Sequence, residues 1–581
     1  MFDFEDIPEE EGKPDGDGAA AGNSQEEAEK PKEVSVVHKK DFDPYKILGI
    51  AFDATDSVIK SAFRKASVKV HPDHNPSPEA AAQFRDLVEV KEFLLDPKKR
   101  VWYNLTHGMG QVTANVKWWL NWDELFSELE PSEDRGAETE APGPVPASVL
   151  PKGSKVDILI FGATGVTGML ACASMEQRSS GRTWAIAGRD ERKLRLLEQK
   201  FGRSAAGFRG AWRMEKPEDI DSLVGAARIV IDVSGPKWIM GSFVAEACVR
   251  TGTHYVENSG FEGDILQARK AKDKLDAAAQ SKDVALVYFC GAYQVHCDFG
   301  AWSIAKQLRE KFGVRMRRLD LYQHYVHFQM GGSSTQAWVG PKDFAAQIKE
   351  YDWPFILGGE KEGRDLDEDE DPEVCYQDEY HPDIWLTPGE KNAGVMITRL
   401  SAGMFDGTEE SWGDKLCFKL HDLVQGDKKA GENQLMVNMM FRKAYDKYVA
   451  DEKCASPGSG ARERVRKEGM PTRIFVAEAD EVKSRSRRRR FHMVTSFGPG
   501  GWGNPDEGTA AMVCDAALCL LESMEAGLEV RPGFGTPTWH LAHLGFYEKV
   551  MAHGQSSEVV EGYAPRALFQ TVMSGAANIG N

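Results

Sequence analysis

The sequence lacks the features that mark membrane, secreted and nucleic-acid-binding proteins. Its longest apolar run, residues 510–521, is interrupted by Asp515 and is too short for a membrane span, which needs about 20 apolar residues. The first residues combine no basic stretch with an apolar one, so we expect no signal peptide. The nine cysteines include no CxxC pair, which is typical of a reducing compartment. The formal net charge of −18 argues against a nucleic-acid partner, because such a partner needs a basic surface. We therefore expect a cytoplasmic location and no transmembrane span, with association with a membrane surface left open.

At 581 residues the chain is long enough for several domains. Residues 1–38 are rich in Asp and Glu and poor in apolar residues, which predicts a disordered acidic tail. Residues 131–151 are rich in Pro, Gly and Ala and predict a linker. Residues 116–126 form an amphipathic aromatic segment, which we interpret as a helix packed on a folded neighbour or, alternatively, as an exposed recognition helix. An acidic segment at 360–373 and a basic one at 483–490 are interpreted as a solvated loop and a charged strand face. The alternative is that they pair with each other or hold a partner.

Residues 41–107 show the pattern of a helical hairpin. Asp43 precedes a proline that opens a short helix, because proline fits the first helical position. Residues 57–70 follow with helical periodicity. Their apolar face consists of Ile59, Ala62, Phe63, Ala66 and Val70. Their opposite face is basic and consists of Lys60, Arg64, Lys65 and Lys69.

The second helix is expected to end at His71-Pro72-Asp73, because proline disfavours the helical state of the residue before it. A third helix is predicted over residues 78–95, where apolar residues recur every three or four positions. With Asp43-Pro-Tyr-Lys-Ile-Leu-Gly49 and Asp96-Pro-Lys-Lys-Arg100, these elements resemble the J-domain family over its full length. The resemblance implies that the segment binds a seventy-kilodalton heat-shock chaperone and stimulates its ATPase. The residues that it implies for this contact are His71, Pro72, Asp73, Lys60, Arg64, Lys65 and Lys69.

A glycine motif stands between a predicted strand and a predicted helix. Residues 155–161 form an apolar run typical of a buried parallel strand. The motif that follows consists of Gly162, Ala163, Thr164, Gly165, Val166, Thr167 and Gly168. Gly162 permits a tight turn, Gly165 lets the backbone approach a pyrophosphate, and Gly168 allows close helix packing. A phosphate would then lie at the helix N-terminus, where amide donors and the helix dipole favour it.

The loops after the next strands indicate which dinucleotide binds. The second strand, residues 183–187, is followed by Arg189 instead of a carboxylate. Arginine can accept a 2′-phosphate, so NADP(H) is favoured over NAD(H). The alternative interpretation of this loop is that Asp190, next to Arg189, forms a turn or caps a helix. A fourth strand is expected at residues 253–257. The third strand, residues 229–233, leads into the crevice residues Ser234, Gly235 and Pro236.

Five segments of this half resemble the saccharopine dehydrogenase-like oxidoreductases, a group that includes the trans-acting enoyl reductases. They are Phe161-GATGVTG-Met169, Trp184-AIAGRDERKL-Arg195, Ile231-DVSGP-Lys237, Ala247-CVRTGTHYVENSG-Phe261 and Cys290-GAYQVHCDFG-Ala301. The resemblance implies a Rossmann domain at 153–290, a second α/β domain at 291–500 for substrate binding and dimerisation, and C-terminal helices at 501–581 that return to the first domain. It makes a homodimer an expectation. The sequence departs from the family pattern near Asn258, Ala292 and Cys297, so nucleotide binding is better kept than catalysis.

Candidate catalytic residues follow the last predicted strand. No tyrosine is followed by a lysine four positions later, which excludes the YxxxK pair of short-chain reductases. His296 and Asp298 lie in a predicted crevice loop, where either could donate a proton to a reduced substrate. The alternative is structural, with Asp298 capping a helix that begins near Phe299 and Cys290 as a small buried residue. No His and Cys spacing fits a structural zinc site, so we expect no metal.

The sequence therefore predicts a multidomain protein. An all-α J-domain hairpin is expected at 39–109, an aromatic segment and linker at 110–152, and then an α/β Rossmann domain with a second α+β domain. The expected function is that of an NADP-dependent oxidoreductase that transfers a hydride to a small-molecule or lipid-like substrate and carries a J-domain. The alternative function is that of a specialised co-chaperone whose dehydrogenase-like domain is a non-catalytic binding module.

Overall fold

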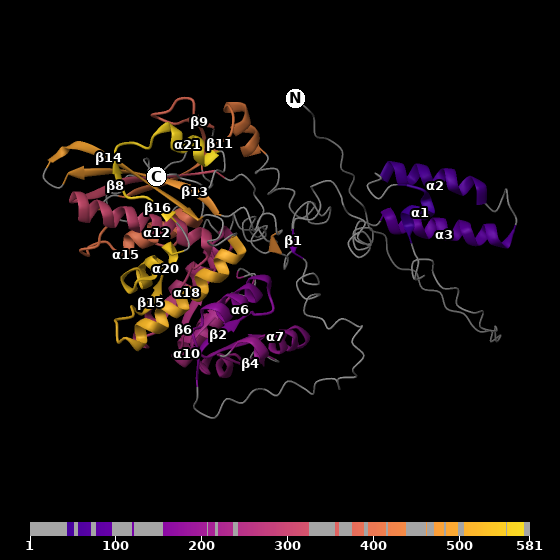
Figure 1. Ribbon diagram of the computed structural model, residues 1–581, viewed down its shortest axis with the longest axis horizontal. Coiled ribbons are helices and arrows are strands. Elements are labelled where there is room, and N and C mark those ends of the chain that lie inside the picture. The colour runs from indigo at the N-terminus through magenta and orange to yellow at the C-terminus, as the bar shows by residue number, and fades with distance from the viewer. Residues whose placement is uncertain are drawn as a thin grey trace, which may run out of the picture. The chain divides into compact units, whose positions relative to one another are not determined.

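The computed structural model describes three N-terminal helices and most of the chain beyond residue 154 (Figure 1). The described residues are 43–50, 56–70, 77–95, 119–120, 155–205, 207–214, 219–235, 237, 242–324, 355–359, 375–388, 393–413, 416–436, 460–461, 470–481, 484–497, 505–552 and 555–573. They belong to two compact units, Met1–Val112 and Thr113–Asn581. The predicted acidic tail, the linker at 131–151 and the acidic segment at 360–373 lie outside the described residues.

The first unit contains helices α1 (Pro44–Leu48), α2 (Asp56–Val70) and α3 (Pro78–Leu95). Asp43 caps α1 by accepting hydrogen bonds from the amides of Tyr45 and Lys46 at 3.1 and 3.0 Å. The predicted apolar face of α2 is confirmed, because Ile59 is fully buried and its other members pack on the same core. Helix α3 contributes Leu87, Val90, Phe93 and Leu94 to that core. The second helix ends at Val70 as predicted, but His71, Pro72 and Asp73 lie outside the described residues.

The second unit begins with a seven-stranded parallel sheet in the order β15-β7-β6-β5-β2-β3-β4. Its strands are β2 (Val156–Phe161), β3 (Trp184–Gly188), β4 (Phe208–Arg213), β5 (Ala227–Asp232), β6 (His254–Glu257), β7 (Ala285–Val287) and β15 (Gly533–Gly535). The helices of this part are α6 (Val166–Arg178), α7 (Glu191–Ser204), α8 (Ile220–Gly225), α10 (Phe243–Thr251) and α11 (Glu262–Ser281). The parallel order and the helical crossovers confirm the predicted Rossmann architecture.

A second, mixed sheet has the order β16-β14-β13-β8-β11-β10-β9, with β17 also paired to β14. Its strands are β8 (Val314–Gln323), β9 (Tyr376–Gln377), β10 (Trp385–Pro388), β11 (Cys417–Val424), β13 (Met470–Glu481), β14 (Ser484–Phe497), β16 (Gln555–Ser556) and β17 (Val560–Glu561). Arg489 and Arg490 of the basic segment pair with Glu561 and Glu478 at 2.8 and 2.9 Å. Both residues lie in strand β14, and because they are consecutive they point to opposite faces of the sheet.

Helix α12 (Ala292–Gln307) links the two sheets and continues as the π-helical turn η3 (Leu308–Phe312). Its side chains share one hydrophobic core with residues of both sheets. Helices α15 (Ala393–Met404), α18 (Pro505–Glu525), α19 (Pro537–Leu541) and α20 (Phe546–Met551), with the 3-10 turn η5 (Ala542–Leu544), complete this core. Because α12 starts directly after β7, it carries the chain from the carboxyl edge of the parallel sheet into the second sheet.

Two segments differ from the sequence-based expectation. The chain beyond residue 501 returns to the parallel sheet through α18 and β15, but β16, β17 and α21 (Arg566–Met573) then join the second sheet. The aromatic segment at 116–126 was expected to be a helix, but Trp119–Leu120 form the short strand β1. Strand β1 pairs with β12 (Gly460–Ala461), so a distant partner overrides the local helical pattern.

Candidate functional site

The glycine turn after β2 is held by contacts that admit no side chain at two of its positions. Gly162 has a φ of +86°, and a Cβ atom there would lie 2.5 Å from the amide nitrogen of Ser234. A Cβ atom at Gly168 would lie 2.2 Å from the carbonyl oxygen of Gly162. Both glycines are thus required by packing of the turn against β5 and of α6 against the turn.

Gly165 differs from Gly162 and Gly168, because no described residue lies close enough to require a glycine there. Its φ of −86° and ψ of 165° are accessible to any residue. The nearest atom that a Cβ would meet, the carbonyl oxygen of Gly162, is 3.4 Å away. Gly165 is the N-cap of α6 and offers no side-chain cap, so Val166, Thr167 and Gly168 form a first turn whose amides have no intrahelical acceptor. Such a helix start binds anions.

The end of β3 lies beside this turn. The amides of Gly162 and Ala163 donate to the carbonyl of Ala187 at 2.9 and 3.2 Å, and a Cβ at Gly188 would touch the Thr164 side chain at 3.3 Å. Arg189 follows directly and is exposed.

The two neighbours in the loop after β3 have different roles. Asp190 caps α7 by accepting from the amide of Lys193 at 3.0 Å, as the alternative interpretation of this loop expected. Arg189 makes no ion pair with any residue that the structure describes. Among the described residues, Arg189 is therefore a cation without an ion-pair partner, and it follows the strand end that lies beside the glycine turn.

A buried carboxylate at the end of β5 organises the opposite side of the turn. Asp232 accepts from Ser234 through the amide at 3.0 Å and through the hydroxyl at 2.6 Å. The ammonium of Lys237 lies 2.5 Å from the other carboxylate oxygen, and the Tyr255 hydroxyl donates to that oxygen at 2.9 Å. Burial raises the pKa of Tyr255 well above its ordinary value, so its hydroxyl stays protonated. Gly235 is exposed at the edge of this loop, and Pro236 lies outside the described residues.

A second buried acid ends the neighbouring strand β6. Glu257 accepts hydrogen bonds from the amide and hydroxyl of Ser259, both at 2.6 Å, and from the amide of Phe289 at 2.8 Å. Burial raises the pKa of Glu257 to about 7, and the nearby charge of Lys237 limits that rise. Glu257 therefore changes its protonation near neutral pH.

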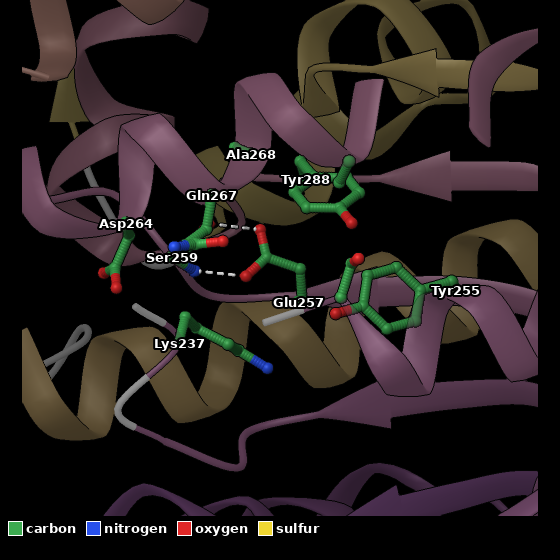
Figure 2. Close-up of a pocket in the computed structure, with 10 residues that line it drawn as sticks. Lys237, Tyr255, Glu257, Ser259, Asp264, Gln267, Ala268 and Tyr288 are labelled. Carbon is green, nitrogen blue, oxygen red and sulfur yellow. Dashed lines mark hydrogen bonds between the residues drawn. The ribbon is translucent and has the colours of Figure 1, made fainter. Parts of the chain in front are cut away.

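These side chains surround a small pocket at the carboxyl edge of the parallel sheet (Figure 2). Lys237, Tyr255, Glu257 and Ser259 line it, and in this view Glu257 lies between Ser259 and Tyr255 (Figure 2). The full lining consists of Lys237, Ser242, Tyr255, Glu257, Ser259, Asp264, Gln267, Ala268, Ala271 and Tyr288. Sequence reasoning did not single out Lys237, Tyr255 or Glu257. The available signal was an acid as the last residue of two adjacent buried strands, where ligands bind in such sheets.

The predicted catalytic residues lie elsewhere. Helix α12 begins at Ala292, so the expectation of a helix starting near Phe299 is wrong, and Asp298 lies inside the helix and does not cap it. The Asp298 carboxylate accepts from the amide of Thr538 at 3.2 Å, and burial raises its pKa to about 6. His296 is hydrogen-bonded to Thr495 of β14, and burial, with Arg473 nearby, lowers its pKa well below its ordinary value. Neither side chain lines the pocket.

The described residues contain neither a candidate metal centre nor a candidate membrane-spanning helix. No group of three or more His, Cys, Asp or Glu side chains among them is arranged to hold a metal ion. No helix among them is both long and apolar enough to cross a membrane.

Two known protein families match two separate parts of the chain. Residues 43–104 match the DnaJ domain family, and residues 158–287 match the Saccharopine dehydrogenase NADP binding domain family. The chain carries a J-domain and a saccharopine dehydrogenase-like NADP-binding domain. The second match contains the glycine turn, Arg189, Asp232, Lys237 and Glu257. The resemblances noted in the sequence are thereby confirmed.

Similar proteins cover one or the other part of the chain. The Trans-acting enoyl reductase of Mycobacterium leprae is 26% identical over 201 residues, which are 34% of this chain and 44% of that protein. The Chaperone protein DnaJ of Latilactobacillus sakei is 45% identical over 69 residues, which are 12% of this chain and 18% of that protein. The chain thus spans less than half the length of these relatives. A solved structure of saccharopine dehydrogenase (L-Glu forming) from Saccharomyces cerevisiae aligns with 70% of this chain and all of its own, at 10% identity and a TM-score of 0.38.

Proposed function

We propose that the second unit is an NADP(H)-dependent oxidoreductase and that the J-domain recruits a seventy-kilodalton heat-shock chaperone to it. The observation that carries the first part is Gly165. Its backbone conformation and its surroundings would accept a side chain, unlike those of Gly162 and Gly168. A glycine there has a function only if another molecule approaches the backbone closely. A pyrophosphate at the start of α6 meets that condition.

The basic loop beside the turn supports NADP(H) over NAD(H). Arg189 is exposed and makes no ion pair with a described residue. It directly follows Gly188, where a Cβ atom would lie 3.3 Å from the Thr164 side chain of the turn. A guanidinium in this place can hold a 2′-phosphate through two parallel hydrogen bonds. Asp190, which would repel such a phosphate, is turned to the cap of α7.

When bound, the nicotinamide supplies or accepts a hydride. When the cofactor gives a hydride, the protein would supply the proton from the cluster on Asp232. When the cofactor accepts a hydride, the same cluster would take up the proton. Lys237 is held by that carboxylate at 2.5 Å and by the Asp232 carbonyl oxygen at 3.1 Å, and its ammonium lines the pocket. Tyr255 donates to the same carboxylate and keeps its own proton. We propose Lys237 as the proton donor and Tyr255 as the residue that orients it through Asp232.

The test of the cofactor proposal compares two glycines of the same turn. NADPH is titrated into the full chain and followed by nicotinamide fluorescence. Gly165→Val should abolish NADPH binding while the protein melts like the wild type. Gly168→Val is the matched control: it should lower the melting temperature, because its side chain would collide with the Gly162 carbonyl. Stimulation of the chaperone ATPase should be unchanged in Gly165→Val.

Two outcomes would contradict the cofactor proposal. Undiminished NADPH binding by Gly165→Val would mean that this glycine does not face the dinucleotide. Binding of neither NADPH nor NADH by the wild type would leave the alternative function, a co-chaperone whose dehydrogenase-like domain is a non-catalytic module.

The chaperone proposal is supported by the surface of α2. Lys60, Arg64 and Lys65 are exposed on the side of the helix opposite the buried Ile59. Their spacing aligns three positive charges along one helix face, which steers an acidic partner surface onto the helix. The loop His71-Pro72-Asp73 would then supply the register of the contact.

A further inference from the structure

The strand order of the parallel sheet determines which half of a dinucleotide would lie over which strands. From β2 the chain runs through β3 to β4 on one side, and then returns to β5, β6 and β7 on the other side. A pyrophosphate at the start of α6 would lie at this reversal. Arg189, which we propose for the 2′-phosphate, follows β3, so the adenosine half would lie on that side. The nicotinamide half would therefore lie at the ends of β5 and β6.

The ends of these two strands carry charges that differ in how they are paired. Asp232 and Glu257 are the last residues of β5 and β6, and the strand register places them side by side. Asp232 is paired with the ammonium of Lys237 at 2.5 Å, so these two charges cancel. The hydrogen bonds that Glu257 receives come from uncharged donors, the amide and hydroxyl of Ser259 and the amide of Phe289. Ionisation of Glu257 therefore adds a negative charge that its own hydrogen-bond donors do not cancel.

The other titratable groups around Glu257 come from four segments of the chain. Tyr255 of β6, Tyr288 after β7 and Cys290 before α12 are buried, which raises the pKa of each well above its ordinary value. These three groups stay uncharged near neutral pH. Asp264 lines the pocket from the first turn of α11 and is the other acid of the lining. It provides a comparison for Glu257 within the same pocket.

The two forms of the cofactor differ in charge at the nicotinamide ring, which is positive in NADP⁺ and neutral in NADPH. A buried carboxylate attracts a positive ring through the protein, and at a separation of about 10 Å the attraction changes affinity by about tenfold. A protonated carboxyl group has no such effect. Burial raises the pKa of Glu257 to about 7, so both of its states are populated near neutral pH.

We propose that Glu257 selects between the oxidised and the reduced cofactor, because its carboxylate favours NADP⁺ whereas its protonated form does not. This inference rests on the proposed oxidoreductase function and adds a dependence on pH to it. Below neutral pH the pocket favours NADPH, the form that reduces a substrate. Above neutral pH it favours NADP⁺, the form that oxidises one. Glu257 has this effect through its charge and needs no contact with the ring.

The experiment measures the affinities of NADP⁺ and NADPH for the full chain between pH 5.5 and pH 8.5 by calorimetry. Both forms carry the 2′-phosphate, so the ratio of the two affinities cancels the titration of that group. Because NADP⁺ binds the ionised form of Glu257 more tightly, the ratio of NADP⁺ to NADPH affinity should rise with pH, by about five- to tenfold in the wild type. In Glu257→Gln the ratio should stay at the wild-type value of pH 5.5. Asp264→Asn is the matched control and should keep the rise.

A second measurement uses the wild type alone and so does not depend on the folding of a variant. Binding of NADP⁺ at pH 6.5 should release protons from Glu257, whereas binding of NADPH should not. The difference is obtained by calorimetry in two buffers with different ionisation enthalpies. A ratio that does not change with pH in the wild type, or that rises equally in Glu257→Gln, would overturn this role of Glu257 and leave the oxidoreductase proposal standing. Binding of neither dinucleotide would remove both.

Discussion

Replacing Glu257 by glutamine tests the electrostatics of the pocket directly. The carboxyl group is fully buried and receives three hydrogen bonds, two from Ser259 and one from the Phe289 amide. Burial nevertheless dominates and raises its pKa from 4.5 to about 7. Glutamine has nearly the same shape and keeps one carbonyl acceptor, but it carries no charge at any pH.

The raised pKa sets the sign and the size of the effect. Between pH 4.5 and pH 7 the folded protein keeps a proton on Glu257 that the unfolded chain has released. The wild type is therefore favoured at low pH and loses stability as the pH rises through this interval. At about 1.4 kcal/mol for each pH unit, the loss is about 3 kcal/mol in total, and most of it falls between pH 5 and pH 8. Glu257→Gln should consequently gain stability relative to the wild type as the pH increases.

The assay is urea unfolding of both proteins across pH 5 to 8, followed by tryptophan fluorescence. Only the difference between the two proteins is informative, because burial also raises the pKa of Asp298 and of Asp515 to about 6. Glu246→Gln serves as the control. Burial alone would raise the pKa of Glu246, but hydrogen bonds from Lys274 and Ser242 lower it, so this variant should show no trend above pH 5. A difference between wild type and Glu257→Gln that does not change with pH would refute the assigned ionisation.

Two further predictions concern the dinucleotide and the chaperone. Arg189→Glu should weaken NADPH binding about tenfold or more and leave NADH binding unchanged, because it replaces a cation that can pair with the 2′-phosphate by an anion. Equal losses of affinity for both dinucleotides in a fluorescence titration would contradict this role. Asp73→Asn should abolish stimulation of the chaperone ATPase in single-turnover assays. The double variant Lys60→Glu with Arg64→Glu should weaken association with the chaperone more at low than at high salt, since salt screens exposed charges. Full stimulation by the Asp73→Asn protein would remove the proposed contact.

Features set by neighbouring residues in the chain could be predicted from the sequence. The helices of the first unit follow from the spacing of Ile59, Val90 and Leu94, because each periodicity is complete within one helix. Strands β2, β3, β5 and β6 follow from their apolar runs, since central parallel strands are buried on both faces. The glycine turn is likewise one continuous motif between a strand and a helix.

Features set by distant segments were missed. Strand β15 has three residues, two of them glycine, and it is a strand only because β7, far earlier in the chain, pairs with it. The start of α12 was misplaced because Gly291 offers no side-chain cap. The hydroxyl of Thr509, in α18, accepts from the amide of Ala292 at 3.0 Å and fulfils that role from 217 positions away. No local pattern contains such a partner.

The same distinction explains why the glycine turn can be recognised in the sequence while contacts between the two sheets need the structure. The turn, Arg189 and Ser234, which we propose as the dinucleotide site, lie in loops that each follow one recognisable strand. A row of polar side chains in the second sheet, in contrast, joins Gln323, Arg473 and Thr495 through sheet register and meets α12 only after the two sheets have packed. In the sequence Arg473 is one of many arginines and lies outside the matched family range. Only its burial without a carboxylate partner among the described residues distinguishes it from the ion-paired arginines of β14. Such a long-range cluster can change through a few substitutions in the second sheet, while the glycine turn stays as it is.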